Sequence, residues 1–275
     1  MAEIVAAVGF PHTPGFPAAV KRDGPDCETA RFFAAQRSVL EAARVDIIVM
    51  FDTDHLNTFF FDNLPIFAVG VDDGFAGPND DVEAFPSRPM RSHRDFGQHI
   101  RAACIAADFD VSSVEQYKVD HSIMVPLYFV TPQFDVPVIP VFICGHVPPW
   151  PSAKRCLALG HAVREAIRRW PASLRVAVAG SGSFSLDVHG TKINPGLPFG
   201  VPDPAWAKRV AELIGAADVE RLVAETTPER IRNAGSVAGE ILNWVAMLAS
   251  TGTTRPLFVH NQPQFGHSYA AWRLE

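Results

Sequence analysis

The stretch VDIIVMF (45–51) is short, β-branched and almost wholly apolar, which is the pattern of a central strand covered on both faces. Other short runs of this kind are predicted strands: IVAAVGF (4–10), PIFAVG (65–70), VPVIPVFIC (136–144), LRVAVAG (174–180) and PLFVHNQ (256–262). Segments with helical periodicity or composition lie between them: 28–44, 93–107, 153–170, 204–213, 216–224, 228–233 and 236–249. The stretch 122–130 is ambiguous, because Pro126 favours a helix start or a kink. This alternation predicts an α/β fold with a central sheet covered by helices, and the lack of a linker or repeat favours one catalytic domain over residues 1–275.

Charge and hydropathy exclude several classes of protein. The net charge of −6 offers no electrostatic basis for binding nucleic acid or an anionic membrane surface. The apolar runs end well short of the ~20 residues that a membrane span needs. The N-terminal MAEIVAAVGF has no basic region, and we interpret it as a strand and not as a signal peptide. Four cysteines without CxxC spacing are typical of free thiols, so we expect a reducing compartment, the cytoplasm.

Three histidines lie in polar stretches at or near the ends of predicted elements. His12 lies in FPHTPG, where the alternative role is a loop histidine bonded to backbone. His55 lies in FDTDHLN, where Asp52 or Asp54 is a candidate to orient the imidazole, and a plain polar turn is the alternative. His121 lies in VDHS, which equally suits a helix N-cap with the histidine incidental.

The stretch AGSGSFSLDVHG (179–190) fits neither the GxGxxG nor the GxSxG motif. It is either a donor-rich loop beside a ligand or a simple loop after a strand. His146 and His260 have no role that spacing assigns, and His267, in FGHSYAAW, is a candidate to reach a site from the C-terminal segment.

Glu240 lies in VAGEILNWVAML, at helical spacing from the apolar residues Val237 and Trp244. A carboxylate on such a face requires a cation, a metal or hydrogen-bond donors, and an ion pair with Arg232 is the structural alternative. Two loop imidazoles and one carboxylate would form the facial arrangement of non-haem Fe(II) enzymes, which leaves three coordination positions open. Three protein ligands also suit catalytic Zn²⁺, and spacing does not distinguish the two metals.

Six segments together resemble the class III extradiol ring-cleavage dioxygenases of the protocatechuate 4,5-dioxygenase β-subunit type. They are PHTPG, TDHLNTFFFDNLPIFAVG, DHSIMVPLYF, RCLALGHAVREAI, AGSGSFS and AGEILNWVAML, and they extend over nearly the whole chain. The resemblance implies that His12, His55 and Glu240 bind Fe(II) and that His121 lies near the substrate. It also implies a catechol-like substrate whose adjacent oxygens chelate the iron, O₂ as co-substrate, and a muconic semialdehyde-type product.

One departure from the family concerns its acid/base histidine, which follows a Gly-Gly-x-Ser run. Leu186 stands at that position here, and His189 is three residues further along. Either His189 or His121 then transfers the proton, or the step differs. The departure leaves open an aminophenol substrate, or a non-catalytic metal-binding relative that acts through protein interaction. Some relatives need a small α subunit, so we expect either that partner or a homo-oligomer.

Overall fold

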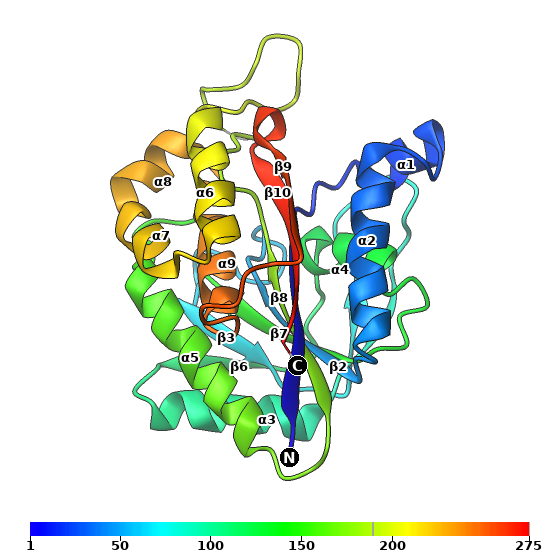
Figure 1. Cartoon of the computed structure of the whole chain (residues 1–275), viewed down its shortest axis with the longest axis vertical. Coiled ribbons are helices and arrows are strands. Elements are labelled where there is room, and N and C mark those ends of the chain that lie inside the picture. Colours follow the sequence, from blue (N-terminus) through cyan, green and yellow to red (C-terminus); the bar gives the residue numbers. More distant parts are fainter. Residues whose placement is uncertain (189, 275) are drawn as a thin grey trace.

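The computed structural model describes residues 1–188 and 190–274. In these residues a mixed sheet of eight strands has the order β6-β3-β7-β2-β8-β1-β10-β9 (Figure 1). Its strands are β1 (Glu3–Phe10), β2 (Ile47–Asp52), β3 (Phe67–Gly70), β6 (Val111–Val114), β7 (Val138–Ile143), β8 (Arg175–Ser181), β9 (Phe258–Gln262) and β10 (His267–Arg273). A separate hairpin pairs β4 (Gly74–Gly77) with β5 (Arg88–Arg91). The α/β class predicted from the sequence is confirmed.

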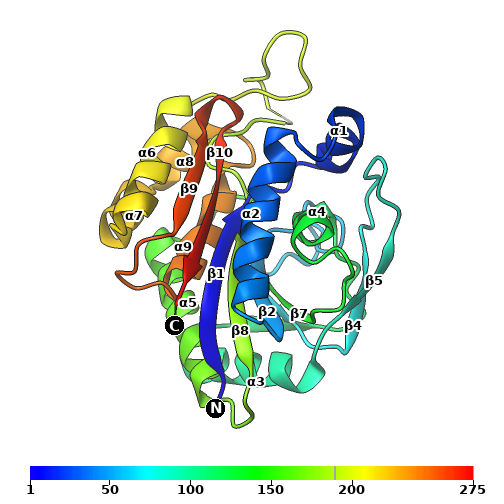
Figure 2. The ribbon, with the colours of Figure 1, turned by 45° about the vertical axis from the view of Figure 1, so that its right-hand side comes forward.

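Helices cover both faces of the sheet (Figures 1 and 2). One face carries α3 (Arg94–Ala106), α5 (Ala153–Arg169), α6 (Pro204–Ala216), α7 (Val219–Glu225), α8 (Pro228–Ala234) and α9 (Ile241–Leu248). The other face carries α1 (Phe16–Asp23), α2 (Glu28–Ala42) and α4 (His121–Val130), with the β4–β5 hairpin beyond them. The sheet is therefore enclosed between two layers, as its apolar strands require.

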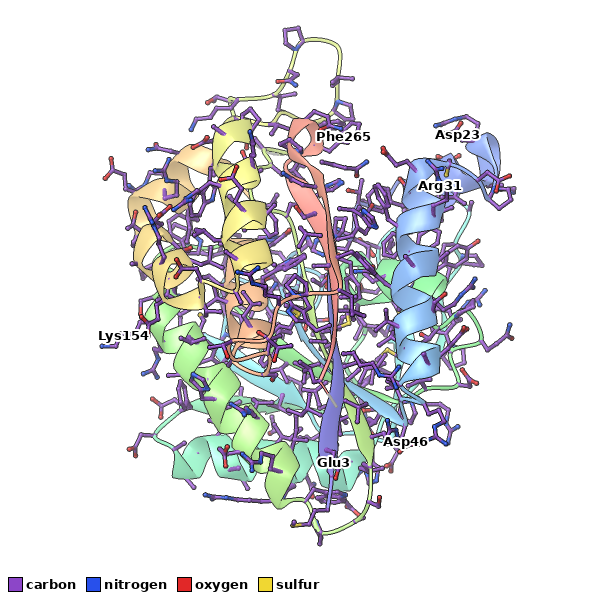
Figure 3. All side chains as sticks on the ribbon, in the orientation of Figure 1. Glu3, Asp23, Arg31, Asp46, Lys154 and Phe265 are labelled. Atoms are coloured by element: carbon purple, nitrogen blue, oxygen red, sulfur yellow. The ribbon has the colours of Figure 1, made fainter. Side chains whose placement is uncertain are left out.

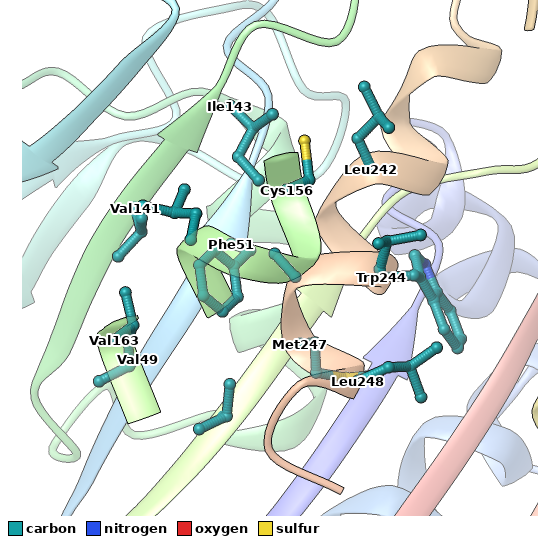
Figure 4. Close-up of a cluster of buried hydrophobic side chains, with 14 of the residues drawn as sticks. Val49, Phe51, Val141, Ile143, Cys156, Val163, Leu242, Trp244, Met247 and Leu248 are labelled. Carbon is teal, nitrogen blue, oxygen red and sulfur yellow. The ribbon is translucent and has the colours of Figure 1, made fainter. Parts of the chain in front are cut away.

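Strand β2 shows why the sheet is buried on both faces. Ile47, Val49 and Phe51 point into one apolar cluster, while Ile48 and Met50 point into the other. In Figure 4, Val49 and Phe51 lie beneath side chains of α5 and α9. Because β2 pairs in parallel with β7 on one side and β8 on the other, it occupies the middle of the sheet.

The surface is polar where the interior is apolar. In Figure 3 the labelled Asp23, Arg31 and Lys154 project from the periphery of the ribbon, and each is exposed. Among the described residues, no helix is long and apolar enough to cross a membrane.

Four adjacent strands, β7, β2, β8 and β1, run parallel. Their carboxyl ends therefore meet at one edge of the sheet, where α/β proteins commonly form binding sites. His146, His55 and His12 follow β7, β2 and β1, and Gly182 follows β8. Residues far apart in the chain are brought together by this strand order.

Several elements were not predicted. The hairpin strands, β6, α1 and β10 were all missed, although β10 lies in the sheet between β1 and β9. The ambiguous stretch 122–130 is helix α4, which has Pro126 in its interior. The helix predicted over 236–249 is shorter: a 3₁₀ turn, Ala238–Glu240, precedes α9. Since α9 is buried on every side, its apolar residues do not define a single stripe.

Candidate metal centre

The structure brings together His12, His55 and Glu240. The Nε2 atom of His12 lies 3.2 Å from Glu240 Oε1, and the Nε2 atom of His55 lies 3.3 Å from the same oxygen. Glu240 is 1% exposed, and within the described residues its partners are three imidazoles and the Ser183 backbone N–H, so the alternative ion pair with Arg232 is wrong. The carboxylate instead faces imidazoles.

The hydrogen bonds around His12 define its tautomer. Its Nδ1 lies 2.7 Å from Ser181 Oγ, whose hydroxyl donates to the Ser122 carbonyl oxygen, also at 2.7 Å. The one hydroxyl proton of Ser181 is used in the bond to the Ser122 carbonyl. Ser181 Oγ must therefore accept from His12, whose Nδ1–H is the donor. The Ser122 carbonyl is available because Pro126, four residues on in α4, lacks the N–H that would otherwise bond it. The neutral His12 therefore presents a lone pair on Nε2.

His55 is oriented in the same way by a different residue. Its Nδ1 lies 2.9 Å from Asp120 Oδ2, which also accepts from the His55 backbone N–H at 2.8 Å. The expectation that Asp52 or Asp54 orients this imidazole is wrong. Asp54 accepts backbone N–H groups of residues 57–59, and Asp52 accepts from the Ser122 hydroxyl. Asp120 also accepts from Ser122 N–H as the N-cap of α4, so the predicted cap is present. The same carboxylate therefore caps the helix and orients His55.

Two Nε2 lone pairs thus face one carboxylate oxygen, an arrangement that needs a positive charge between them. Metal bonds of about 2.1 Å at right angles separate neighbouring donor atoms by about 3.0 Å, close to the spacing found here. Without a metal, a proton on His55 can supply the positive charge. Burial opposes this protonation, but Asp120 and Glu240 raise the pKa of His55 to about 10. The donor set and its outer hydrogen bonds fit a divalent metal.

The loop after β8 holds the far oxygen of Glu240. The backbone N–H of Ser183 donates to Glu240 Oε2 at 2.7 Å. A Cβ on Gly182 would lie 2.3 Å from the Glu240 Cβ, so only glycine allows this approach. One backbone donor of this loop therefore contacts a candidate metal ligand. His189 lies outside the described residues.

His121 lies beside the two imidazoles, with its ring centroid 4.1 Å from that of His55 and 5.4 Å from that of His12. Its Nδ1 and its backbone N–H both bond the carboxylate of Asp80. Burial and the neighbouring His55 lower the pKa of His121, although Asp80 opposes them. Sequence analysis missed Asp80, which is distant in the chain and belongs to no motif.

His146 was left without a role, yet its Nε2 lies 3.0 Å from Glu240 Oε1. Burial and the nearby His55 lower the pKa of His146 to about 4. Its position directly after a predicted strand was the available signal. The side chain of His267 has other partners: its Nε2 bonds Gln262 Oε1 at 2.9 Å, and its ring packs against Phe16.

Comparisons with known proteins give chains similar in sequence. A protein of Burkholderia vietnamiensis named 2,3-dihydroxyphenylpropionate/2,3-dihydroxicinnamic acid 1,2-dioxygenase is 27% identical over 267 residues, covering 83% of this chain and 82% of its own. The Paraburkholderia xenovorans protein of the same name is 31% identical over 233 residues, covering 84% of this chain and 66% of its own. A gallate dioxygenase of Pseudomonas putida is 29% identical over 162 residues, covering 58% of this chain and 46% of its own.

A solved structure supports the fold. The crystal structure of the uncharacterized protein JW3007 from Escherichia coli K12 matches 97% of this chain and 99% of its own, with a TM-score of 0.61 and 14% identity.

A family model described as the catalytic LigB subunit of aromatic ring-opening dioxygenase matches residues 6–270. This match spans the loops after β1 and β2, which carry His12 and His55, and the turn that carries Glu240. The chain therefore belongs to the LigB family of aromatic ring-opening dioxygenases, as the resemblance in its sequence implied.

Proposed function

We propose that the protein is an Fe(II)-dependent extradiol dioxygenase that opens the ring of a catecholic substrate with O₂, with His12, His55 and Glu240 as metal ligands. The observation that carries this proposal is the pair of Nε2 lone pairs directed at one buried carboxylate oxygen. An imidazole–imidazole–carboxylate set is the preferred site of non-haem Fe(II) enzymes that handle O₂. When held by these three residues, Fe(II) would supply the chemistry that lets the diol react with O₂.

Side chains of the protein would accept and donate the protons that ring opening requires. We propose that His121 accepts a proton from the diol at its Nε2, because the bond to Asp80 leaves the Nδ1 proton in place. Leu186 has no group that transfers a proton. His189 is our candidate for the second proton transfer, which protonates the opening ring, since it is the nearest histidine in the sequence.

The substrate class is proposed from the names of the relatives. Since the named relatives act on dihydroxyphenyl acids and on gallate, we propose a catecholic acid as the substrate. We also propose one catalytic domain over residues 1–275, a cytoplasmic location supported by four unpaired cysteines, and assembly as a homo-oligomer or with a small α subunit.

The test is metal analysis of anaerobically purified protein together with O₂ uptake over a panel of catechols and one aminophenol. Fe(II)-loaded protein is expected to consume O₂ with a catecholic acid and to form a yellow ring-opened product. Chelation should abolish uptake, and Fe(II) should restore it. Zinc content with hydrolysis in the absence of O₂, or no uptake with any diol, would refute the proposal. Uptake only with the aminophenol would replace the proposed substrate.

Asp120→Asn is expected to weaken Fe(II) affinity about 10–100-fold, the usual effect of removing the carboxylate behind a metal-binding histidine. Asparagine still caps α4, but the metal-free variant loses the buried pair with His55 and should melt at a lower temperature, so affinity is compared on protein shown to be folded. Competition with a chromogenic chelator measures the affinity. The exposed Asp26→Asn is the matched control and should leave it unchanged. Wild-type affinity in Asp120→Asn would show that Asp120 does not orient His55.

A further inference from the structure

His267 is a buried histidine whose two ring nitrogens differ in their partners. Its side chain is 4% exposed. The Nε2 atom lies 2.9 Å from Gln262 Oε1, whereas Nδ1 has no hydrogen-bond partner among the residues that the structure describes. Because buried polar atoms are almost always hydrogen-bonded, Nδ1 calls for a partner from outside the chain.

The neighbouring side chains determine which tautomer of His267 is present. The Nε2 atom of Gln262 lies 2.7 Å from Glu28 Oε2. A carboxylate only accepts hydrogen bonds, so the amide NH₂ of Gln262 faces Glu28 and its carbonyl faces His267. That carbonyl requires a donor, which is the Nε2–H of His267. In the neutral ring Nδ1 therefore carries a lone pair, which accepts a hydrogen bond and cannot donate one.

The register of the sheet places His267 near the candidate metal ligands. Strand β10 pairs antiparallel with β1, and Gly9 lies opposite Ala270. The start of β10, where His267 lies, therefore runs beside the end of β1, which His12 follows. Burial lowers the pKa of His267 to about 3, with a further contribution from His12, while Glu240 opposes them. The ring is thus neutral at physiological pH and lies within electrostatic range of two of the three candidate ligands.

The loop after β8 fixes the backbone next to His267. The Gly266 carbonyl accepts from the backbone N–H of Phe184 at 2.7 Å and from that of Ser185 at 3.1 Å. A Cβ on Gly266, whose φ is +73°, would lie 1.7 Å from the Ser185 carbonyl oxygen, so only glycine fits there. The same loop holds the carboxylate of Glu240. His267 is therefore held in a fixed relation to the candidate metal centre.

We propose that His267 is a substrate-binding residue, and that its Nδ1 accepts a hydrogen bond from a hydroxyl or amino group on the ring of the substrate. This inference rests on the proposed function and narrows its substrate class. An ionised carboxylate offers only acceptors, so the acid group of the substrate is not the group that His267 contacts. The substrate is then a catecholic acid with a further hydrogen-bond donor on its ring.

Three probe acids separate the effect of a donor from that of an extra oxygen. Gallate has three ring hydroxyls, protocatechuate has two, and the monomethyl ether of gallate keeps the third oxygen without its proton. Wild type is expected to have a kcat/KM for gallate about 10–100-fold above the values for the other two acids, because each of these leaves the buried Nδ1 unpaired. Anaerobic titration of the Fe(II)-loaded protein should give the same order of affinities.

Two substitutions distinguish the two ring nitrogens. His267→Asn places an amide oxygen near the position of Nδ1, and it is expected to keep part of the preference for gallate. His267→Gln keeps an NH₂ donor for Gln262 but has no acceptor in place of Nδ1, and it should lose most of the preference. His161→Gln, which removes an exposed histidine on α5, is the control and should behave as wild type. Circular dichroism of the metal-free proteins checks that they are folded.

Nitrogen NMR of histidine-labelled, metal-free protein gives a readout that is independent of activity. The ring of His267 should show a protonated Nε2 and an unprotonated Nδ1. A proton on Nδ1, a wild type that uses the three acids equally or prefers one without the third donor, or an undiminished preference in His267→Gln would overturn this inference and leave the proposed function standing. Absence of O₂ uptake with these acids and with every other catechol would refute the proposed function itself.

Discussion

Glu240→Gln is expected to abolish stable Fe(II) binding and to lower kcat/KM for ring opening by about 10³-fold or more, equivalent to roughly 4 kcal/mol. The amide has nearly the shape of the carboxylate but carries no charge. Oε1 of Glu240 faces the lone pairs of His12 and His55, so the substitution removes the anionic ligand while the imidazoles keep their orienting bonds. An amide NH₂ directed at those nitrogens would replace metal binding with hydrogen bonds.

The measurements for this variant are iron content after anaerobic loading and O₂ uptake with the substrate identified for wild type. Glu165→Gln on the outer face of α5 is the matched control, since its side chain is about half exposed. That control should retain both iron and activity. Full iron occupancy in Glu240→Gln would show that the carboxylate is not a ligand.

Trp244→Ala is expected to destabilise the protein by about 3–5 kcal/mol, the usual cost of emptying a large buried aromatic site. Trp244 is fully buried in α9, and Figure 4 shows its side chain near that of Leu248. Its ring fills the space above Gly9, where a Cβ would lie 2.2 Å from it, and packs edge-on against Phe184. Its Nε1–H donates to the Gly182 carbonyl at 3.0 Å, so the loop that holds Glu240 also loses a contact.

Urea denaturation of the metal-free protein measures this effect without interference from metal binding. Trp244→Phe keeps most of the ring and loses the hydrogen bond, so it should cost about 1–3 kcal/mol, mainly for the Gly182 carbonyl left unsatisfied. Phe61→Ala, at a side chain 75% exposed, should stay within about 0.5 kcal/mol of wild type. Equal stability of Trp244→Ala and wild type would contradict the packing described for α9.

The class of fold was predictable because strand burial is visible in local sequence. The apolar run of β2 predicts a strand covered on both faces, and β7 and β8 behave similarly. Strand β10 was missed although all but one of its residues are buried, because Ser268 and the two central alanines give it no clear run or alternation. Pairing with β1 and β9, and not intrinsic preference, makes it a strand.

The three candidate ligands could be picked out in the sequence for a different reason. His12 and His55 follow strand ends, and Glu240 is an acidic residue among apolar ones, so each is conspicuous in its own segment. Their orienting partners are not conspicuous. Asp120 is 65 residues from His55, and Ser181 is 169 residues from His12.

The sequence by itself determined the α/β class, the family and the chemical types of the candidate ligands, because these depend on local patterns and residue identities. Tertiary structure alone decided which carboxylate orients His55, that the carbonyl left free by Pro126 sets the tautomer of His12, and that His146 joins Glu240. These relations depend on the order of β7, β2, β8 and β1 in the sheet and on the contact between Gly145 and Gly239. Such long-range packing places side chains to within a hydrogen-bond length, and no pattern within one segment carries that information.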